Sequence, residues 1–213
     1  MALDATEVYV AGSGHVYTAP AGTEPPADVS IAMPATWTEH GYTNEDGVKV
    51  SFGKTVDQIK GWQTVDPLRI VVTDAPRTVS FALKQLDGLN LLLALGGGEL
   101  TADTTGTRYT PPDTSFLDIR SLCIEGIDGD DLVRFTFYRV TLNAAMEMDL
   151  TRTASADMAI ELAVMANNPY PFIIDMPSGD RWDGTVTAPG NGALSEPATV
   201  VTPAHAPAKI AVA

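Results

Sequence analysis

Apolar and polar side chains alternate along much of the chain, and a period of two residues is typical of β-strands with one buried face. In GVKVSFG, residues 47–53, the two valines and the phenylalanine occupy one face, with Lys49 and Ser51 on the other. The segments 68–73 and 77–85 show the same alternation on either side of an Asp-Ala-Pro turn signal, so we expect them to pair as a hairpin. The apolar residues expected to meet across it are Leu68, Ile70, Val72, Val79, Phe81 and Leu83.

The longest alternating stretch covers residues 136–166 and predicts two strands joined as a long β-hairpin. Its first strand, residues 136–150, would span about 50 Å at about 3.3 Å per residue, which is long for a strand. One face of the hairpin is apolar and the other is polar and mostly acidic. The apolar face holds Tyr138, Val140, Leu142, Ala144, Met146, Met148 and Leu150 from the first strand, and Met158, Ile160, Leu162, Val164 and Ala166 from the second.

Turn and helix signals fill the spaces between the strands. The segment QLDGLNLLLALGGG, residues 85–98, is the one good helix candidate, with Asp87 at its start and three glycines at its end. Near the N-terminus, EVYVAGSGHVYTAP predicts a hairpin whose turn is residues 11–14. The acidic run Asp128–Asp131 is expected to form a turn between strands 117–127 and 132–144, although such a cluster could also hold calcium.

These elements predict a mainly β fold of the sandwich or barrel-like kind, with one short flanking α-helix and the long hairpin. Residues 1–177 form the expected β-domain. Beyond Ser178 the composition turns to Ala, Pro and Gly, which cannot build a core. Residues 178–213 are therefore expected to be either an extended arm lying on a neighbour or a disordered tail.

The charge limits the possible partners. The formal net charge is -14, so the chain would repel nucleic acid rather than grip it. No apolar run is long enough to cross a bilayer, and the first residues lack the features of a signal peptide, so we expect a soluble protein with no membrane partner, made in a cytoplasm. The single cysteine, Cys123, lies in a strand-like run and is expected in the core.

No catalytic or metal constellation can be assembled from the sequence. The three histidines, His15, His40 and His205, lie in separate segments without a second ligand at metal spacing. AGSGH lacks the nucleophile-elbow spacing, and GGGEL follows a helix instead of opening one, so it forms no phosphate cradle. The carboxylates of the long hairpin are more simply a solvated face than a glycosidase pair. We expect no enzyme activity and no cofactor.

The ordered series GHVYTAPAGTEPP, TWTEHGYTNEDGVKVSFGKTVDQIKGWQTVDPLRIVVT and TVSFALKQLDGLNLLLALGGGEL resembles the major tail tube proteins of long-tailed, siphovirus-like bacteriophages, notably those infecting actinobacteria. The resemblance covers roughly the first 100 residues; its motifs are turn and strand signatures. It implies a β-sandwich with a flanking helix, hexameric rings, and rings stacked into a tube whose lumen is a closed barrel of strands.

The resemblance assigns roles to two groups of residues. The polar face of the long hairpin would line the channel, with an acidic lumen that lets DNA slide. The segment 54–67 resembles the family's long loop that reaches between subunits, with Trp62 as an anchor. The lumen-lining candidates are Arg139, Thr141, Asn143, Glu147, Asp149, Asp157 and Glu161, and the inter-subunit candidates are Lys54, Asp57, Ile59, Lys60, Trp62 and Gln63.

Further partners follow from the same resemblance. They are other copies of the chain, a tape measure protein within the lumen, the tail terminator and distal tail proteins at the tube ends, and DNA passing without specific binding. The expected location is the virion tail, after synthesis in the host cytoplasm.

Two other hypotheses remain open from the sequence. A carbohydrate- or receptor-binding β-sandwich could use Trp37, Trp62 and Trp182 as stacking platforms, although the three lie in separate segments. A different virion protein, such as a capsid decoration or tail terminator protein, would also be small and β-rich.

Overall fold

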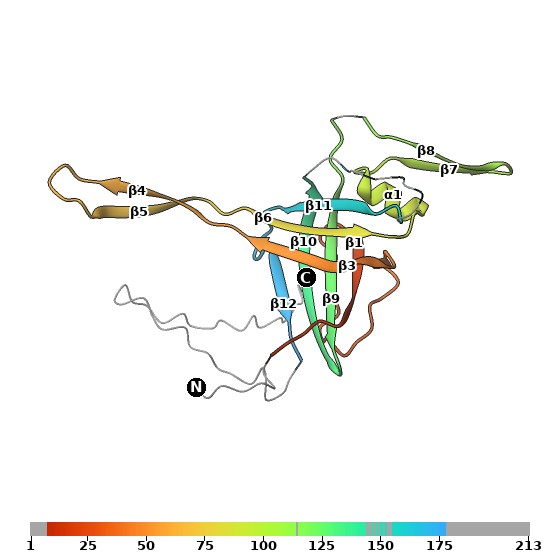
Figure 1. Cartoon of the computed structure of the whole chain (residues 1–213), viewed down its shortest axis with the longest axis horizontal. Coiled ribbons are helices and arrows are strands. Elements are labelled where there is room, and N and C mark those ends of the chain that lie inside the picture. The colour runs from red at the N-terminus through yellow and green to blue at the C-terminus, as the bar shows by residue number, and fades with distance from the viewer. Residues whose placement is uncertain are drawn as a thin grey trace, which may run out of the picture. The chain divides into compact units, whose positions relative to one another are not determined.

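The computed structural model describes residues 8–113, 115–143, 146, 148, 150, 152 and 155–177, and within these ranges the fold is almost entirely antiparallel β (Figure 1). The elements are β1 (Ser13–Pro20), β2 (Thr38–Glu39), β3 (Thr43–Phe52), β4 (Thr55–Lys60), β5 (Pro67–Asp74), β6 (Arg77–Leu83), α1 (Gly88–Ala94), β7 (Glu99–Asp103), β8 (Gly106–Thr110), β9 (Ile119–Asp128), β10 (Asp131–Leu142), β11 (Met158–Val164) and β12 (Phe172–Asp175). The mainly β fold with one short helix agrees with the sequence prediction.

One sheet holds most of the strands. Its order is β2-β1-β9-β10-β11-β6-β3, and β12 pairs with β10 as a branch. The first part of β10 pairs with β12, while its last residues pair with β11 over three residue pairs, Val140↔Val164 to Leu142↔Leu162. The ladder between β10 and β9 shifts register between Phe137 and Val140. At this bulge β10 passes from the half of the sheet that contains β1 and β9 to the half that contains β11, β6 and β3.

The main core lies between the two halves of the sheet, which pack face to face. β1, β9 and β10 contribute residues such as Val16, Leu122 and Phe137, and β6 and β11 contribute residues such as Phe81 and Ile160. The alternation predicted for residues 158–164 is confirmed, because Met158, Ile160 and Leu162 are all at most 2% exposed. Val48 and Val50 of β3 close the core at its edge.

The second face of the β1-β9-β10 half is covered by the Pro-rich loop, residues 21–37. Trp37 packs there with Ala19 and Cys123. Burial raises the pKa of the Cys123 thiol to about 12, so the residue is a small apolar group, as the sequence predicts.

A buried ion pair fastens the Pro-rich loop to the sheet. Arg134 of β10 lies opposite Glu125 of β9, and both its Nε and its Nη2 donate to Glu125 Oε1, at 2.9 and 2.7 Å. The same guanidinium donates to the carbonyls of Asp28 and Ile31 in the loop, each at 3.0 Å. The charge is therefore paired, and further guanidinium donors are satisfied, as a buried arginine requires.

Helix α1 is held by a buried polar network. Asp87 caps the helix by accepting from the Asn90 amide at 2.9 Å, and Asn90 Nδ2 donates to the carbonyls of His40 and Gln85. Asn90 Oδ1 then accepts from His40 Nδ1 at 2.7 Å, which leaves His40 Nε2 to accept from the Thr18 hydroxyl, also at 2.7 Å. Gly96–Gly98 follow the helix with positive φ, as the predicted helix stop requires.

Three sequence predictions about β1 and β10 are wrong. β10 ends at Leu142 instead of Leu150, so β10 and β11 do not form one long ribbon. Tyr138 does not share a face with Val140, because the bulge changes the alternation, and its hydroxyl donates to Glu24 of the Pro-rich loop. Residues 8–10 form no hairpin with β1; β1 pairs instead with β9 and β2.

The predicted turn at Asp128–Asp131 is confirmed between β9 and β10, with Gly129 at φ 63°. Asp128 Oδ2 accepts from the Val10 amide at 3.1 Å, which ties the N-terminal segment to this turn. Across the described residues, no group of three or more His, Cys, Asp or Glu side chains could hold a metal ion.

Replacing Arg134 by Ala is expected to lower the free energy of unfolding by about 3–5 kcal/mol, because Glu125 is left buried without its partner. Urea unfolding measures this. The matched control is Arg108→Ala on the exposed strand β8, which is expected to change stability by no more than about 0.5 kcal/mol. Equal effects of the two substitutions would contradict the anchoring role of Arg134.

Acid is expected to destabilise the fold through His40, whose pKa in the folded protein is lowered mainly by burial. As the pH falls below the ordinary histidine value of about 6.5, the unfolded chain takes up a proton that the folded chain resists, so stability falls toward the folded-state pKa. In urea unfolding across this range, His40→Gln should show a shallower fall than the unsubstituted chain. The exposed Thr107→Gln variant should keep the full slope, and an unchanged slope in His40→Gln would refute the assignment.

Candidate assembly surfaces

A polar sheet face lies opposite the main core on β3, β6, β11 and the last residues of β10. Because side chains alternate along each strand, the residues between the core positions point away from the core. Those side chains are mostly small or uncharged, and they are partly or fully exposed. The polar sheet face consists of Lys49, Ser51, Thr78, Ser80, Ala82, Arg139, Thr141, Asn143, Ala159, Glu161 and Ala163.

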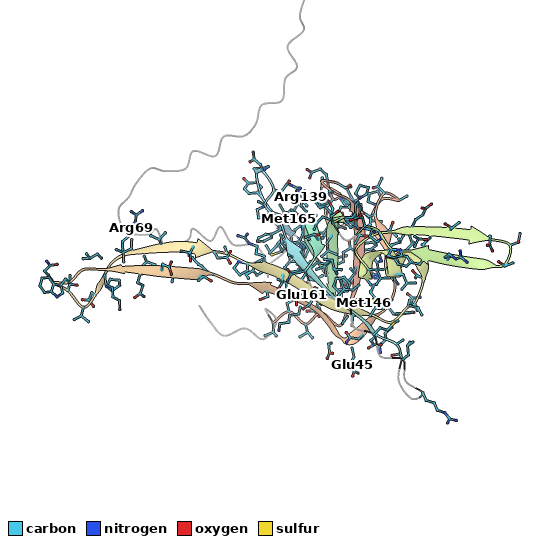
Figure 2. The ribbon with its side chains drawn as sticks, turned by 90° about the horizontal axis from the view of Figure 1, so that it is seen from above. Glu45, Arg69, Arg139, Met146, Glu161 and Met165 are labelled. Atoms are coloured by element: carbon cyan, nitrogen blue, oxygen red, sulfur yellow. The ribbon has the colours of Figure 1, made fainter. Side chains whose placement is uncertain are left out.

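Register aligns these residues in rows across the strands. Lys49 lies opposite Ser80, and Ser80 lies opposite Glu161. The row continues to β10, because the Asn143 amide donates to the Glu161 carbonyl at 2.9 Å and Asn143 Nδ2 donates to Glu161 Oε1 at 2.7 Å. A polar row therefore crosses four strands, and Figure 2 shows Glu161 and Arg139 on this sheet.

Charges on and beside the polar sheet face are nearly balanced in the described ranges. Lys84 Nζ lies 3.4 Å from Asp157 Oδ1 and 3.0 Å from the Ser155 hydroxyl. The hydrogen bond from Ser155, together with Lys84, holds the pKa of the Asp157 carboxyl below its usual range, so the group is ionised at neutral pH. Asp46 shares a shallow hollow with Lys49, Ser80 and Glu161. The carboxylates Asp46, Asp157 and Glu161 thus equal in number the cations Lys49, Lys84 and Arg139.

Five of the seven lumen-lining candidates are described, and the structure brings them to this one region. Arg139, Thr141, Asn143 and Glu161 lie on the polar sheet face, and Asp157 directly precedes β11. Glu147 and Asp149 lie outside the described residues. Sequence reasoning missed the contribution of β3 and β6, although the alternation in VKVSF and TVSFALK carried the signal.

A second surface is the β4–β5 arm, residues 54–74, which extends away from the large sheet as its own two-stranded ladder (Figure 1). It prolongs the β3–β6 pairing, because Phe52 lies opposite Arg77 and Thr55 lies opposite Asp74. The predicted hairpin between residues 68–73 and 77–85 is therefore wrong. Asp74-Ala75-Pro76 interrupts one long strand without reversing it, and the chain reverses instead at residues 61–66.

The arm is amphipathic. Directly opposite residues of an antiparallel pair share a face, so the pairs Val56↔Val72 and Gln58↔Ile70 lie on one side, and Asp57↔Val71 and Ile59↔Arg69 lie on the other. Leu68 joins Ile70 and Val72 by alternation. The apolar face of the arm is thus Val56, Leu68, Ile70 and Val72, exposed by 42%, 66%, 57% and 49%.

Within the described residues, no other segment of the chain packs on the arm. Every residue of β4 is exposed, and Trp62 at the tip is 99% exposed. An isolated two-stranded hairpin is at best marginally stable in water, and a contiguous exposed apolar face marks an interaction surface. The arm therefore has the features of an interaction surface.

The inter-subunit candidates all lie on this arm. Lys54 lies in its base, Asp57, Ile59 and Lys60 lie in β4, and Trp62 and Gln63 lie in the tip. The segment is a regular hairpin instead of the predicted loop. The return strand β5, which carries most of the apolar face, was missed because its residues were assigned to the core.

One of the three tryptophans proposed as stacking platforms for a ligand is buried. Trp37 is 5% exposed and its indole donates to the Glu24 carbonyl at 3.4 Å, so it belongs to the core. Trp182 lies outside the described residues. Trp62 is thus the one tryptophan that the structure shows exposed.

Comparison with known proteins identifies a family over most of the chain. Residues 1–174 match a family model described as phage tail tube protein. No curated protein matches the chain. In the part of the chain that the structure covers, no helix is long and apolar enough to cross a membrane.

The two described tryptophans offer a matched test of the arm. Trp62→Ala should change the free energy of unfolding of the monomer by no more than about 0.5 kcal/mol, because the side chain touches little. Trp37→Ala should cost about 3–5 kcal/mol, because it empties a buried site. In sedimentation at high concentration, Trp62→Ala should assemble more weakly than the unsubstituted chain. A Trp62→Ala monomer that unfolds as easily as Trp37→Ala would place Trp62 in the core instead.

Proposed function

The chain belongs to the phage tail tube protein family, which makes it a structural protein of the virion, and we propose that it assembles as hexameric rings stacked into the tube that delivers the genome. The observation that carries the proposal is the pairing of two features in one chain. A sheet face of small polar side chains has a solid core behind it, and an apolar arm projects from the same strands without cover.

In this proposal the polar sheet face lines the channel. Its small side chains give a smooth wall, and its cations are matched by carboxylates instead of forming a basic track. DNA phosphates bind proteins through clusters of Lys and Arg, so such a wall would let DNA pass without holding it. Glu147 and Asp149 lie outside the described residues and stay lining candidates from the sequence resemblance alone; their charges would make the net charge of the lining negative.

Ring closure would use the edge of β3. Among the described strands, β3 pairs only with β6, so its other edge presents unpaired backbone groups. An exposed edge of this length invites pairing with another chain, and closing the strands of all subunits into a barrel removes the edge. The arm would then fasten each subunit to its neighbours.

The remaining partners are proposed from the same family role. A tape measure protein would occupy the lumen before DNA passes, and tail terminator and distal tail proteins would bind the tube ends. The subunit would be made in the host cytoplasm and assembled there into virions. No catalytic step is required of it.

Thiol labelling of an Ala159→Cys variant tests the lining. Ala159 is exposed on the polar sheet face, and the native Cys123 is fully buried, so background labelling is low. In the monomer, small and large maleimides should both react with the introduced thiol. In assembled tubes the small reagent should still react, because it diffuses into the channel, while a large polyethylene glycol maleimide should not.

The neighbouring residue provides the control for this labelling. Ile160 lies on the opposite face at 2% exposure, so Ile160→Cys should stay unreactive in both states. Reaction of Ala159→Cys with the large reagent in tubes would place the polar sheet face on the outside. Loss of reaction with both reagents would place it in a subunit contact, and either result contradicts the proposal.

A further inference from the structure

A second apolar surface, away from the arm, surrounds helix α1. Its side chains are large and clearly exposed, although the helix itself is firmly seated. We call it the α1 patch, and it consists of Tyr42 (76% exposed), Leu86 (55%), Leu89 (52%), Leu95 (37%), Phe116 (55%) and Leu117 (56%). Exposed apolar side chains gathered in this way mark a binding surface rather than ordinary scatter.

The orientation of the α1 patch is fixed by what the helix buries. Asn90, Leu93 and Ala94 face the body of the protein, and Asn90 is locked by its bonds to His40 and Gln85. Leu89 consequently points outward. Tyr42 joins the patch at the start of the helix, where its amide donates to Gln85 Oε1 at 2.9 Å and its carbonyl accepts from the Lys84 amide at 2.9 Å.

The other end of the α1 patch is built by the segment after the helix. A Cβ added at Gly97 would lie 2.8 Å from the Phe116 ring, which places that ring against the glycine turn that ends α1. Phe116 and Leu117 therefore extend the apolar surface beyond Leu95. With α1 itself about 10 Å long at 1.5 Å per residue, the patch can receive a flat element such as a two-stranded ribbon.

The arm and the α1 patch lie at opposite ends of one strand. The arm joins β6 at Arg77, and the segment leading to α1 leaves β6 after Leu83. Figure 1 shows the arm and α1 on opposite sides of the sheet. Because β6 spans about 20 Å at about 3.3 Å per residue, the arm of one chain points away from its own patch. Contact between the two surfaces requires a second copy.

One basic residue of the arm can meet the acidic margin of the α1 patch. Lys60 alternates with Val56 and Gln58 along β4, so it lies on the apolar face, whereas Arg69 lies on the opposite face with Ile59. Neither residue forms an ion pair with a described residue. Figure 2 shows Arg69 on the arm, far from the large sheet. Asp87, Glu99 and Asp113 lie in the segments that carry or flank the α1 patch, also outside the ion pairs of the described chain. Hydrogen bonds from Ser115 lower the pKa of Asp113, which keeps it ionised.

We propose that the apolar face of the β4–β5 arm of one copy binds the α1 patch of another copy, with Lys60 of the arm beside the carboxylates around that patch. The contact joins two different surfaces, so it is head-to-tail, and head-to-tail contacts repeat into rings or open fibres instead of stopping at a dimer. The inference rests on the proposed self-assembly and adds the receiving surface.

A different receptor for the arm would be the hollow beside β3, of about 600 Å³, whose lining includes Val16, Val50, Phe52, Ile124 and Phe135. Tyr9 and residues 11–14 of the same chain also line this hollow. Its own N-terminal segment thus already lies there, while no described segment lies over the α1 patch. The cross-linking experiment must therefore distinguish binding of the arm at the α1 patch from binding at this hollow.

Disulfide trapping between two variants, each with one introduced cysteine besides the buried Cys123, tests the contact. Ile70→Cys on the apolar face of the arm and Leu89→Cys on the α1 patch are mixed, assembled and mildly oxidised, and tubes are checked by electron microscopy in the same sample. A disulfide forms only when the two Cβ atoms come within about 4.5 Å. The expected result is a cross-linked dimer, present in tubes and absent from dilute monomers.

Two control pairs sharpen the test. Asp57→Cys, on the opposite face of the arm, should give several-fold less cross-link with Leu89→Cys. Ile70→Cys should likewise give little with Val50→Cys in the hollow beside β3.

The outcomes separate the inference from the proposed function. Tubes in which Ile70→Cys links to Val50→Cys but not to Leu89→Cys would overturn the inference and leave the tube assignment standing. If the unsubstituted chain forms no tubes under any condition, the proposed function fails, and the inference fails with it.

As a second measurement, Leu89→Asp should weaken assembly while leaving the folded monomer intact by circular dichroism, and the exposed Thr107→Asp on β8 should do neither. Normal assembly of Leu89→Asp would also overturn the inference.

Discussion

The bulge in β10 between Phe137 and Val140 is the constraint on which the two-layered fold depends. Before the bulge, Phe135 and Phe137 face the main core; after it, Val140 and Leu142 do. Under strict alternation, Arg139 and Thr141 would follow Phe137 into the core, and burying an unpaired arginine costs several kcal/mol. One extra residue in the bulge instead places Arg139 and Thr141 on the polar sheet face. The apolar side chains of β10 therefore face the core on both sides of the bulge.

The two unpartnered apolar surfaces make sense only in an assembly. A monomer gains nothing from holding a ribbon of valine, leucine and isoleucine in water, because exposed apolar area lowers solubility and invites aggregation. The chain carries a net charge of -14, which opposes contact between copies, yet residues 54–74 hold three basic and three acidic side chains and are neutral. Placing the neutral, apolar part of the chain at the contact reduces that repulsion.

Local pattern was enough to predict much of the fold. Fold class, helix α1 with its cap and glycine stop, the Asp128–Asp131 turn and the faces of β11 follow from alternation and turn chemistry, and all are present in the structure. The partners of each strand were harder, because pairing depends on the whole sheet. Leu68, Ile70 and Val72 alternate as a core strand does, and only the long β3–β6 ribbon shows that they lie on an arm. The buried pair Arg134–Glu125 was also missed, since nothing in RFTF marks its arginine as internal.

The proposed role in the tube depends on where the sheet of β3, β6, β11 and β10 lies in the assembled particle. Electron cryo-microscopy of tubes formed by the purified chain measures this directly. The prediction is a tube whose inner wall is the polar sheet face, with Glu161 and Arg139 toward the channel and the β4–β5 arm in contact with a neighbouring subunit. A tube with that face on its outer surface, or a protein that stays monomeric at every concentration, would contradict it.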